Sequence, residues 1–240
     1  DKQTMAALIV ERGGKLIAQG SQSAPIVFTS EAAKGQRKPG DWGGLIICGK
    51  APHNAGESQI EGGPRTKHGG NDPHDNSGIL SYVRVEFAGY PFEKDKEING
   101  ITFGSVGDGT KVDHLQVSYS NDDSYEWFGG TVNCKNLIAF RGWDDDFDTD
   151  NGFSGQVQYG LSVRDARIAD VSQSNGFESD NDASGSTAQP YTSATFSNMT
   201  FVGPKAVDEA FDNSNSFINA GSVFPNNGSA MGLYQAAMQI

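Results

Sequence analysis

The sequence predicts an all-β fold in which short strands stack as the coils of a solenoid. A repeat is the first observation behind this prediction, since Tyr125-Glu126 recurs as Phe147-Asp148, 22 residues later. Strand composition is the second, because short runs rich in Val, Ile and Leu alternate with turns rich in Gly, Asn, Asp and Ser. A period of about 20–50 residues with short apolar strands is typical of stacked repeats.

The acidic residues repeat together with the strands. Residues 122–123 (DD) recur as residues 144–145 (DD), and residues 177–180 (FESD) resemble residues 147–150 (FDTD) after a longer gap. Successive coils of a solenoid place equivalent positions above one another. We therefore expect successive coils to set an aromatic residue and an acid above one another.

Length and composition indicate a single domain over residues 1–240, with a polar loop excursion at about residues 49–78. The chain has 240 residues, of which 31 are Gly, and its 14 Phe, 7 Tyr and 3 Trp can supply a core. Strand-like segments lie at both ends, at residues 6–10 and 235–240. Because a solenoid needs capped ends, we expect a partial chain.

The net charge of −12 argues against a nucleic-acid partner, which would need a basic surface. The same charge favours solubility and the binding of cations. No apolar run is long enough to cross a bilayer, so no membrane-spanning segment is expected in this chain.

Four strands are expected before the excursion, at residues 6–10, 15–18, 25–29 and 44–48. Leu8 and Ile26 are 18 residues apart, and a further 20 residues lead to Ile46. This spacing predicts that the three residues belong to successive coils.

The excursion at residues 49–78 has almost no apolar content and contains His53, His68 and His74. The spacing of these histidines fits no metal-binding template. We therefore expect a solvated loop rather than a metal site.

After residue 80 the strand signal becomes regular. Apolar and polar residues alternate at residues 83–87 (VRVEF) and again at 115–119 (LQVSY), as in half-buried strands. The tail at residues 208–240 is rich in Asn and is harder to assign, although one further coil would fit it.

Cys48 and Cys134 lack the clustered spacing of a zinc site. Two small, buried, apolar residues are the favoured interpretation. A disulfide stays open, because sequence alone does not bring the two sulfur atoms together.

The sharpest candidate for chemistry is the segment in which Asp146, Asp148 and Asp150 put side-chain oxygens on alternate residues. Calcium binds six to eight oxygens, and turns with alternating Asp supply them. The segment is not an EF-hand, because Val157 stands where that loop needs Glu. The alternative is a solvated acidic ridge, although stacked carboxylates repel one another. The predicted calcium ligands are Asp144, Asp145, Asp146, Asp148, Asp150, Glu178, Asp180 and Asp182. The last three repeat the alternate spacing and either supply a second site or complete the first.

Aromatic residues accompany these acids and suggest contact with sugars, since such clefts combine apolar faces with hydrogen-bond acceptors. We expect Phe147 and Phe177 to point into the core, and Trp127 and Trp143 to be exposed. The predicted carbohydrate-binding residues are Trp127, Trp143, Glu126, Asp122 and Asp123. No catalytic residue is assigned, because any acid-rich solenoid offers carboxylate pairs one coil apart.

Four segments carry a resemblance to a known family: residues 40–44 (GDWGG), 82–89 (YVRVEFAG), 121–130 and 143–155. Together they resemble exported proteins of Bacteroidetes, mostly cell-surface lipoproteins or secreted proteins, in the pectin-lyase-like superfamily. The resemblance covers nearly the whole chain and implies a right-handed parallel β-helix. It also implies an extracellular location or the outer-membrane surface, but little about activity.

The enzymes of that superfamily offer a comparison residue by residue. Polygalacturonase-type hydrolases carry Asn-Thr-Asp-Gly, then paired aspartates, Gly-His-Gly and Arg-Ile-Lys. Here residues 148–152 (DTDNG) resemble only the first motif, the aspartate pair at 122–123 precedes it, and the last two motifs are absent. Pectate-lyase-type enzymes hold calcium with acids beside an Arg base, and Arg141 and Arg164 lie near the acidic coils in sequence.

These observations favour a non-catalytic glycan-binding or accessory protein, secreted or at the cell surface and stabilised by calcium. One alternative is a polysaccharide lyase or glycoside hydrolase that uses the acidic coils. Another is a structural or adhesive module of an outer-membrane nutrient-uptake complex. The expected partner is accordingly a polysaccharide or a cell-surface protein complex.

Overall fold

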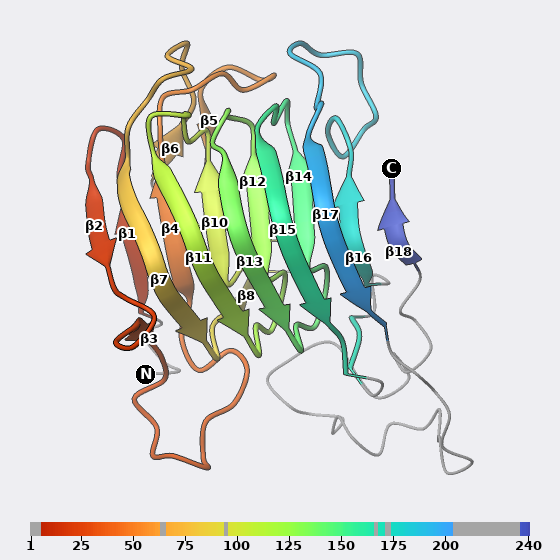
Figure 1. Cartoon of the computed structure of the whole chain (residues 1–240). Coiled ribbons are helices and arrows are strands. Elements are labelled where there is room, and N and C mark those ends of the chain that lie inside the picture. Colours follow the sequence, from red (N-terminus) through yellow and green to blue (C-terminus); the bar gives the residue numbers. More distant parts are fainter. Residues whose placement is uncertain (1–5, 63–65, 94–95, 166–167, 171–173, 204–235) are drawn as a thin grey trace.

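The structure is a computed structural model that describes residues 6–62, 66–93, 96–165, 168–170, 174–203 and 236–240. Within these residues, every element of regular secondary structure is a β-strand (Figure 1). The same part of the chain contains no helix of the length and apolarity needed to span a membrane.

Most strands belong to two long sheets that lie one in front of the other and extend along one axis (Figure 1). Sheet A consists of Ala7–Val10 (β1), Gly44–Cys48 (β4), Ile101–Gly104 (β10), Tyr125–Phe128 (β12), Phe147–Asp150 (β14), Asn175–Ser179 (β16) and Ala236–Gln239 (β18). Sheet B consists of Leu16–Gln19 (β2), Ile26–Phe28 (β3), Gly78–Glu86 (β7), Lys111–Ser118 (β11), Cys134–Phe140 (β13), Gln156–Val163 (β15) and Thr195–Val202 (β17).

Every pairing within these two sheets is parallel. Sheet A has the order β1-β4-β10-β12-β14-β16-β18, and sheet B has the order β17-β15-β13-β11-β7-β2, with β3 also paired to β7. From β3 onward the chain alternates between the sheets, so each further coil adds a strand to both. The predicted all-β parallel β-helix is therefore confirmed. Two antiparallel hairpins lie outside the sheets, Ser58–Gln59 (β5) with Lys67–His68 (β6) and Tyr90–Glu93 (β8) with Lys96–Ile98 (β9).

The sequence repeat corresponds to the strand register of the central coils, because repeated positions pair with one another. Tyr125 of β12 pairs with Phe147 of β14, and Phe147 pairs with Phe177 of β16. On sheet B, Leu115 of β11 pairs with Leu137 of β13. The 22-residue period and its third, more distant copy are both confirmed.

The core lies between the two sheets and contains a stack of aromatic rings. Phe103, Trp127 and Phe153 follow one another with ring centroids 5.6 Å apart at each step. Tyr125 and Phe147 stack in parallel at 5.5 Å. Offset stacking of buried rings adds about 0.5–1.5 kcal/mol per pair beyond the area that they bury. Phe147 and Phe177 are buried in this core, as the sequence predicted.

The first coils follow a different spacing from the one expected. The strands themselves are confirmed, but Leu8 pairs with Leu45 and Ile26 pairs with Val83. The prediction that Leu8, Ile26 and Ile46 belong to successive coils is therefore wrong. The reason is that β2 and β3 both join sheet B, so the chain completes only one coil between β1 and β4.

The excursion is not the solvated loop that its composition suggested. Ile60 and His68 are 2% exposed, and His53 is 7% exposed. Ile60 packs with Ile46 and other apolar residues on the outer face of sheet A. Ile60 also lies directly against the backbone of Gly104 in β10. A Cβ at this position would lie 2.7 Å from Ile60 Cδ1, which explains the glycine.

A column of left-handed residues bends sheet B. Tyr82, His114, Asn136, Tyr159 and Asn198 have φ between 51° and 64°, and each lies on a different one of the strands β7, β11, β13, β15 and β17. We call this set the bend column. It turns each long strand in the middle without breaking the pairing on either side.

Cys48 and Cys134 are buried and free, as expected of small apolar residues. Of the predicted tail coil, residues 204–235 lie outside the described part, and the final strand is present as β18.

Candidate functional site

The candidate site is built on outward positions of sheet A. Alternate residues of a strand point to opposite faces, so inward Phe147 and Thr149 leave Asp148 and Asp150 on the outer face. The parallel register then places Glu126 of β12 next to Asp148 of β14. It places Asp148 next to Glu178 of β16. Three coils thus contribute one column of carboxylates, which we call the acidic ladder: Glu126, Asp148 and Glu178.

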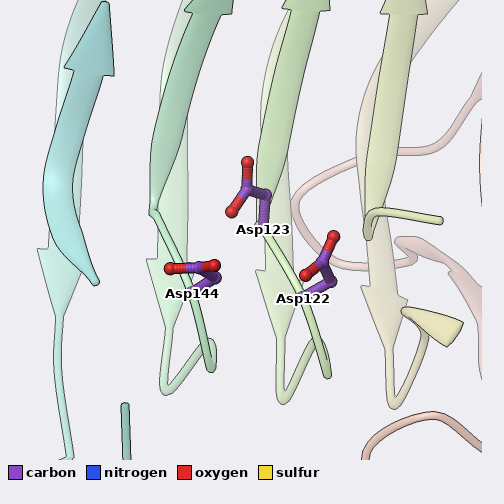
Figure 2. A group of neighbouring side chains, drawn as sticks. All are labelled: Asp122, Asp123 and Asp144. Carbon is purple, nitrogen blue, oxygen red and sulfur yellow. The ribbon is translucent and has the colours of Figure 1, made fainter. Parts of the chain in front are cut away.

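A second set of acids lies on the turns that lead into β12 and β14. Figure 2 shows Asp122 and Asp123 on one turn and Asp144 on the turn of the next coil. Ligand oxygens of these three residues all lie within 4.8 Å of one another. The acids of one turn recur at the same positions in the turn of the next coil, and the stacking of the two coils brings their side chains together.

Asp123 joins the turn acids to the acidic ladder. Its carboxylate also belongs to a second group, with Glu126 and Asp148, whose ligand oxygens lie within 4.8 Å of one another. Asp123 and Glu126 are buried, and Asp148 is half-buried. Four carboxylates from two coils therefore surround the shared residue Asp123.

Burial and mutual repulsion both favour the protonated forms of these acids. Burial raises the pKa of Asp123 well above its ordinary value, and the charges of Asp122 and Asp145 raise it further. Burial likewise raises the pKa of Glu126, with Asp148 as the next cause. Burial and Glu178 raise the pKa of Asp148. The charged groups that act on these three acids are themselves acids.

Two further acid pairs lie beside the ladder. The pKa of Asp145 is raised by burial, by Asp144 and by a hydrogen bond with Glu178. The pKa of Asp150 is raised by burial, by Asp148 and by a hydrogen bond with Asp180. A cation beside either pair would relieve the repulsion between its carboxylates.

The donor set suits a hard cation such as calcium. Calcium prefers six to eight oxygen ligands, including carboxylates and amide carbonyls. Among the described residues, one buried carboxylate oxygen in each of Asp148 and Asp150, Oδ1, has no hydrogen-bond partner. The same is true of Oδ1 in Asn99 and Asn121. Asn99 donates a hydrogen bond to Glu126 through its amide nitrogen, so its neutral oxygen lies beside the ladder.

The structure does not bring all predicted calcium ligands together. Asp146 is turned inward, where its carboxylate accepts hydrogen bonds from Ser162 and, at 3.2 Å, from Arg164. Asp182 lies in a later loop and accepts bonds from Ser184 and Ser186. Asp146 was expected beside Asp148, and this expectation is wrong. Asp182 was expected to complete that site or to belong to a second one, and its carboxylate is engaged within its own loop. Asp146 and Asp182 lie outside the strands, where side chains do not point alternately to the two faces of a sheet. Sequence spacing therefore did not determine the direction of their side chains.

The expected exposure of the two tryptophans is also wrong. Trp127 is completely buried, and Trp143 is 5% exposed and packs against Ile168. Trp127 shares the inward face with Tyr125, two residues earlier, which pairs with the core residue Phe147. The alternation of Tyr125, Glu126 and Trp127 along the strand could therefore have predicted that Trp127 is buried. Neither ring is therefore available to sugars as a stacking surface.

Arg141 and Arg164 do not face the acidic ladder. Arg164 is fully buried and forms an ion pair with Asp146 inside the fold. Arg141 lies over the ring of Phe140 and 3.6 Å from Asp165. Sequence reasoning also missed Asn99, which lies in the turn before β10. A signal was present, because the Asn-Gly pair at residues 99–100 recurs at residues 175–176, at the equivalent position where β16 begins.

Comparison with known proteins gives a match to one family. The family model described as "Pectate-lyase like beta helix domain" matches residues 1–222, most of the chain. No curated protein and no solved structure gives a significant match.

Proposed function

Since the chain belongs to the family of pectate-lyase-like β-helix domains, we propose that it is a non-catalytic glycan-binding protein stabilised by calcium. The observation that carries the calcium part is the convergence of Asp123, Glu126 and Asp148 within 4.8 Å. Without a cation, burial favours the protonated forms of these three acids. A Ca²⁺ ion at this point would instead balance the negative charge of their ionised forms.

The ion would join neighbouring coils. Glu126 and Asp148 belong to adjacent strands of sheet A, and Asp123 precedes the first of them. Binding to the folded state alone stabilises that state in proportion to the logarithm of ligand concentration. The free energy of unfolding should therefore rise with calcium.

The positions of the arginines favour a role without catalysis. A lyase of this superfamily, as the sequence resemblance describes it, needs an Arg base beside its acids. Arg164 is engaged by Asp146 inside the fold, and Arg141 lies beside Asp165. Neither geometry supplies a base at the acidic ladder.

We further propose a location outside the cell or at the outer-membrane surface, with a polysaccharide as partner. The resemblance to exported Bacteroidetes proteins supports this location, and the acidic, calcium-suited donor set is compatible with it. The resemblance to that lipoprotein family in particular remains a prediction.

The test is native electrophoresis of the protein through gels that contain acidic or neutral polysaccharides, with calcium or with chelator. Product size is followed in the same samples. We expect at least one polysaccharide to retard the protein without being cleaved. Cleavage that disappears in Asp145→Asn would instead identify a lyase or hydrolase. Absence of retardation by every polysaccharide would overturn glycan binding and favour an adhesive module with a protein partner.

A further inference from the structure

Two histidines of the excursion are buried where this segment covers the outer face of sheet A. His68 of β6 is 2% exposed, and His53 is 7% exposed. Their rings meet edge to face, with centroids 4.9 Å apart. The ring of His68 also lies on the backbone of β10, since a Cβ on Gly104 would lie 2.8 Å from the Cγ of His68. The two histidines, which we call the histidine pair, are therefore enclosed between the excursion and the sheet.

The hydrogen bonds of the histidine pair favour neutral rings. The Nδ1 atom of His53 accepts a hydrogen bond of 3.0 Å from the backbone N–H of Ala55. A proton on this Nδ1 would place two donors against each other and remove the bond. The Nδ1 atom of His68 lies 2.9 Å from the hydroxyl oxygen of Ser105, which is completely buried. Protonation of either ring would put a charge inside a buried contact, which is costly unless an opposite charge faces it.

The charged groups around the histidine pair do not provide that opposite charge. The turn between β1 and β2 contributes Arg12, a cation, whose guanidinium donates a hydrogen bond of 3.1 Å to the carbonyl of Gly69. The excursion contributes Glu57, but its carboxylate is engaged by Arg12 at 2.6 Å and by Lys67 at 2.8 Å. Protonation of the pair would therefore add positive charge beside an existing cation.

The neighbours from sheet A are uncharged. β10 is followed by Ser105, β12 contributes the ring of Phe128, and β14 is followed by Asn151. The outward acids of β12 and β14, Glu126 and Asp150, are not among the groups that shift the pKa of either histidine. No carboxylate of the described residues therefore favours the charged form of the pair.

Acid is expected to favour an open excursion for this reason. Burial, followed by the charges of His53 and Arg12, lowers the pKa of His68 to about 3. Burial also lowers the pKa of His53, against a hydrogen bond with Asn151 that raises it. A histidine in contact with solvent titrates near pH 6.5. The advantage of the closed state is therefore complete above about pH 6.5 and is lost as the pH falls towards about 3.

We propose that the excursion is an acid-responsive cover, which seals the outer face of sheet A at neutral pH and releases it when the histidine pair is protonated. Opening exposes the apolar side chains beneath, namely Ile46, Cys48 and Phe128. At about pH 4.5, two units below the solvent value, His68 alone shifts the equilibrium about a hundredfold towards the open state. The device is independent of the calcium and glycan functions proposed above.

The test measures how fast dithiodipyridine modifies Cys48 between about pH 7.5 and about pH 4.5, in the presence of chelator. Division by the rate in urea at the same pH removes the pH dependence of the thiol itself. We expect the corrected rate at Cys48 to rise about a hundredfold in acid. Cys134 lies in the core between the sheets, so it should stay protected and reports any unfolding of the whole chain. The melting temperature is a poor probe here, because the acidic ladder is expected to raise it in acid.

Asparagine is the matched substitution, because its amide can replace the hydrogen bond of Nδ1 without gaining a proton in acid. The double variant with His53→Asn and His68→Asn should keep the slow neutral rate at about pH 4.5. His53→Asn alone keeps an acceptor for Ala55 and should reduce the acid response without abolishing it. His74→Asn changes an exposed histidine of the same excursion, paired with Asp108, and should leave the response intact.

Three outcomes would overturn the proposal. A corrected rate at Cys48 that does not change with pH would mean that the cover stays closed in acid. An equal rise in the double variant would mean that opening does not depend on the histidine pair. An equal rise at Cys134 would mean that acid unfolds the whole chain. A rise at Cys48 that only the substitutions in the histidine pair reduce would support the acid-responsive cover.

Discussion

The outer face of sheet A has two halves that use the same backbone differently. On β4, Ile46 and Cys48 point outward and are covered by Ile60 and Ile98, from the excursion and the β8–β9 hairpin. On β12, β14 and β16, the equivalent column holds the acidic ladder. The inward faces of both halves are apolar and form one core.

This difference separates two kinds of stabilisation. Inward positions are determined by the packing between coils, whereas outward positions are free to specialise. Apolar cover stabilises the fold without a need for protons or a cation, by about 25 cal/mol for each Å² of apolar surface removed from water. A column of carboxylates stabilises it only when protons or a cation neutralise the charge. The halves meet on β12, where outward Glu126 and outward Phe128 lie two residues apart.

The largest effect is expected in the apolar half. Ile46→Ala removes a fully buried side chain beneath the excursion and should lower the free energy of unfolding by about 2–5 kcal/mol. Urea denaturation measures this loss. The matched control is Ile17→Ala, because Ile17 is 60% exposed and its change should stay within about 0.5 kcal/mol. Equal effects in both variants would mean that the excursion does not cover sheet A in solution.

The acidic half should respond to calcium. At a concentration about 100 times its dissociation constant, calcium should raise the free energy of unfolding by about 2.7 kcal/mol. Asp123→Asn should abolish the rise, because Asp123 belongs to both carboxylate groups. Thermal unfolding with calcium and with chelator measures the difference. Glu11→Gln, an exposed acid outside both groups, should respond like the unsubstituted protein.

Without calcium, stability should fall as pH rises, contrary to the usual behaviour of acidic groups. The pKa of Asp148 is raised in the folded state by burial and by Glu178, so the folded state holds a proton that the unfolded state loses near pH 4. The folded state therefore loses its advantage as pH increases from about 4 through the raised pKa. Melting temperatures in chelator should decline over this range. Asp148→Asn should flatten the profile, and a profile that rises in both proteins would contradict the prediction.

The smallest effect is expected for Asp182→Asn. Hydrogen bonds from Ser184 and Ser186 lower the pKa of Asp182 and fix its carboxylate within its own loop. The calcium-induced shift of the melting temperature should be unchanged. A reduced shift would show that this loop reaches the acidic ladder in solution and would extend the acidic half beyond β16.

The sequence was informative where coils are short and regular. The repeat predicted that Tyr125 stacks on Phe147 and that Glu126 lies beside Asp148, because a short period leaves one register available. The prediction from composition failed for the excursion. This segment is mostly polar, but its few apolar side chains, such as Ile60, are buried against the apolar outer face of sheet A. The prediction from spacing failed for Asp146, whose direction depends on Arg164 of the following coil.

Unequal coil lengths have a consequence for folding kinetics. Tyr125 pairs with Phe147 across 22 residues, whereas Leu45 pairs with Ile101 across 56. Closing the longer loop costs about 0.8 kcal/mol more chain entropy. Local pairings form faster than distant ones, so β12 and β14 should assemble first and the N-terminal coils should dock on them afterwards. Pulse-labelling hydrogen exchange during refolding should find the amides of β12 protected before those of β4, and the reverse order would contradict this pathway.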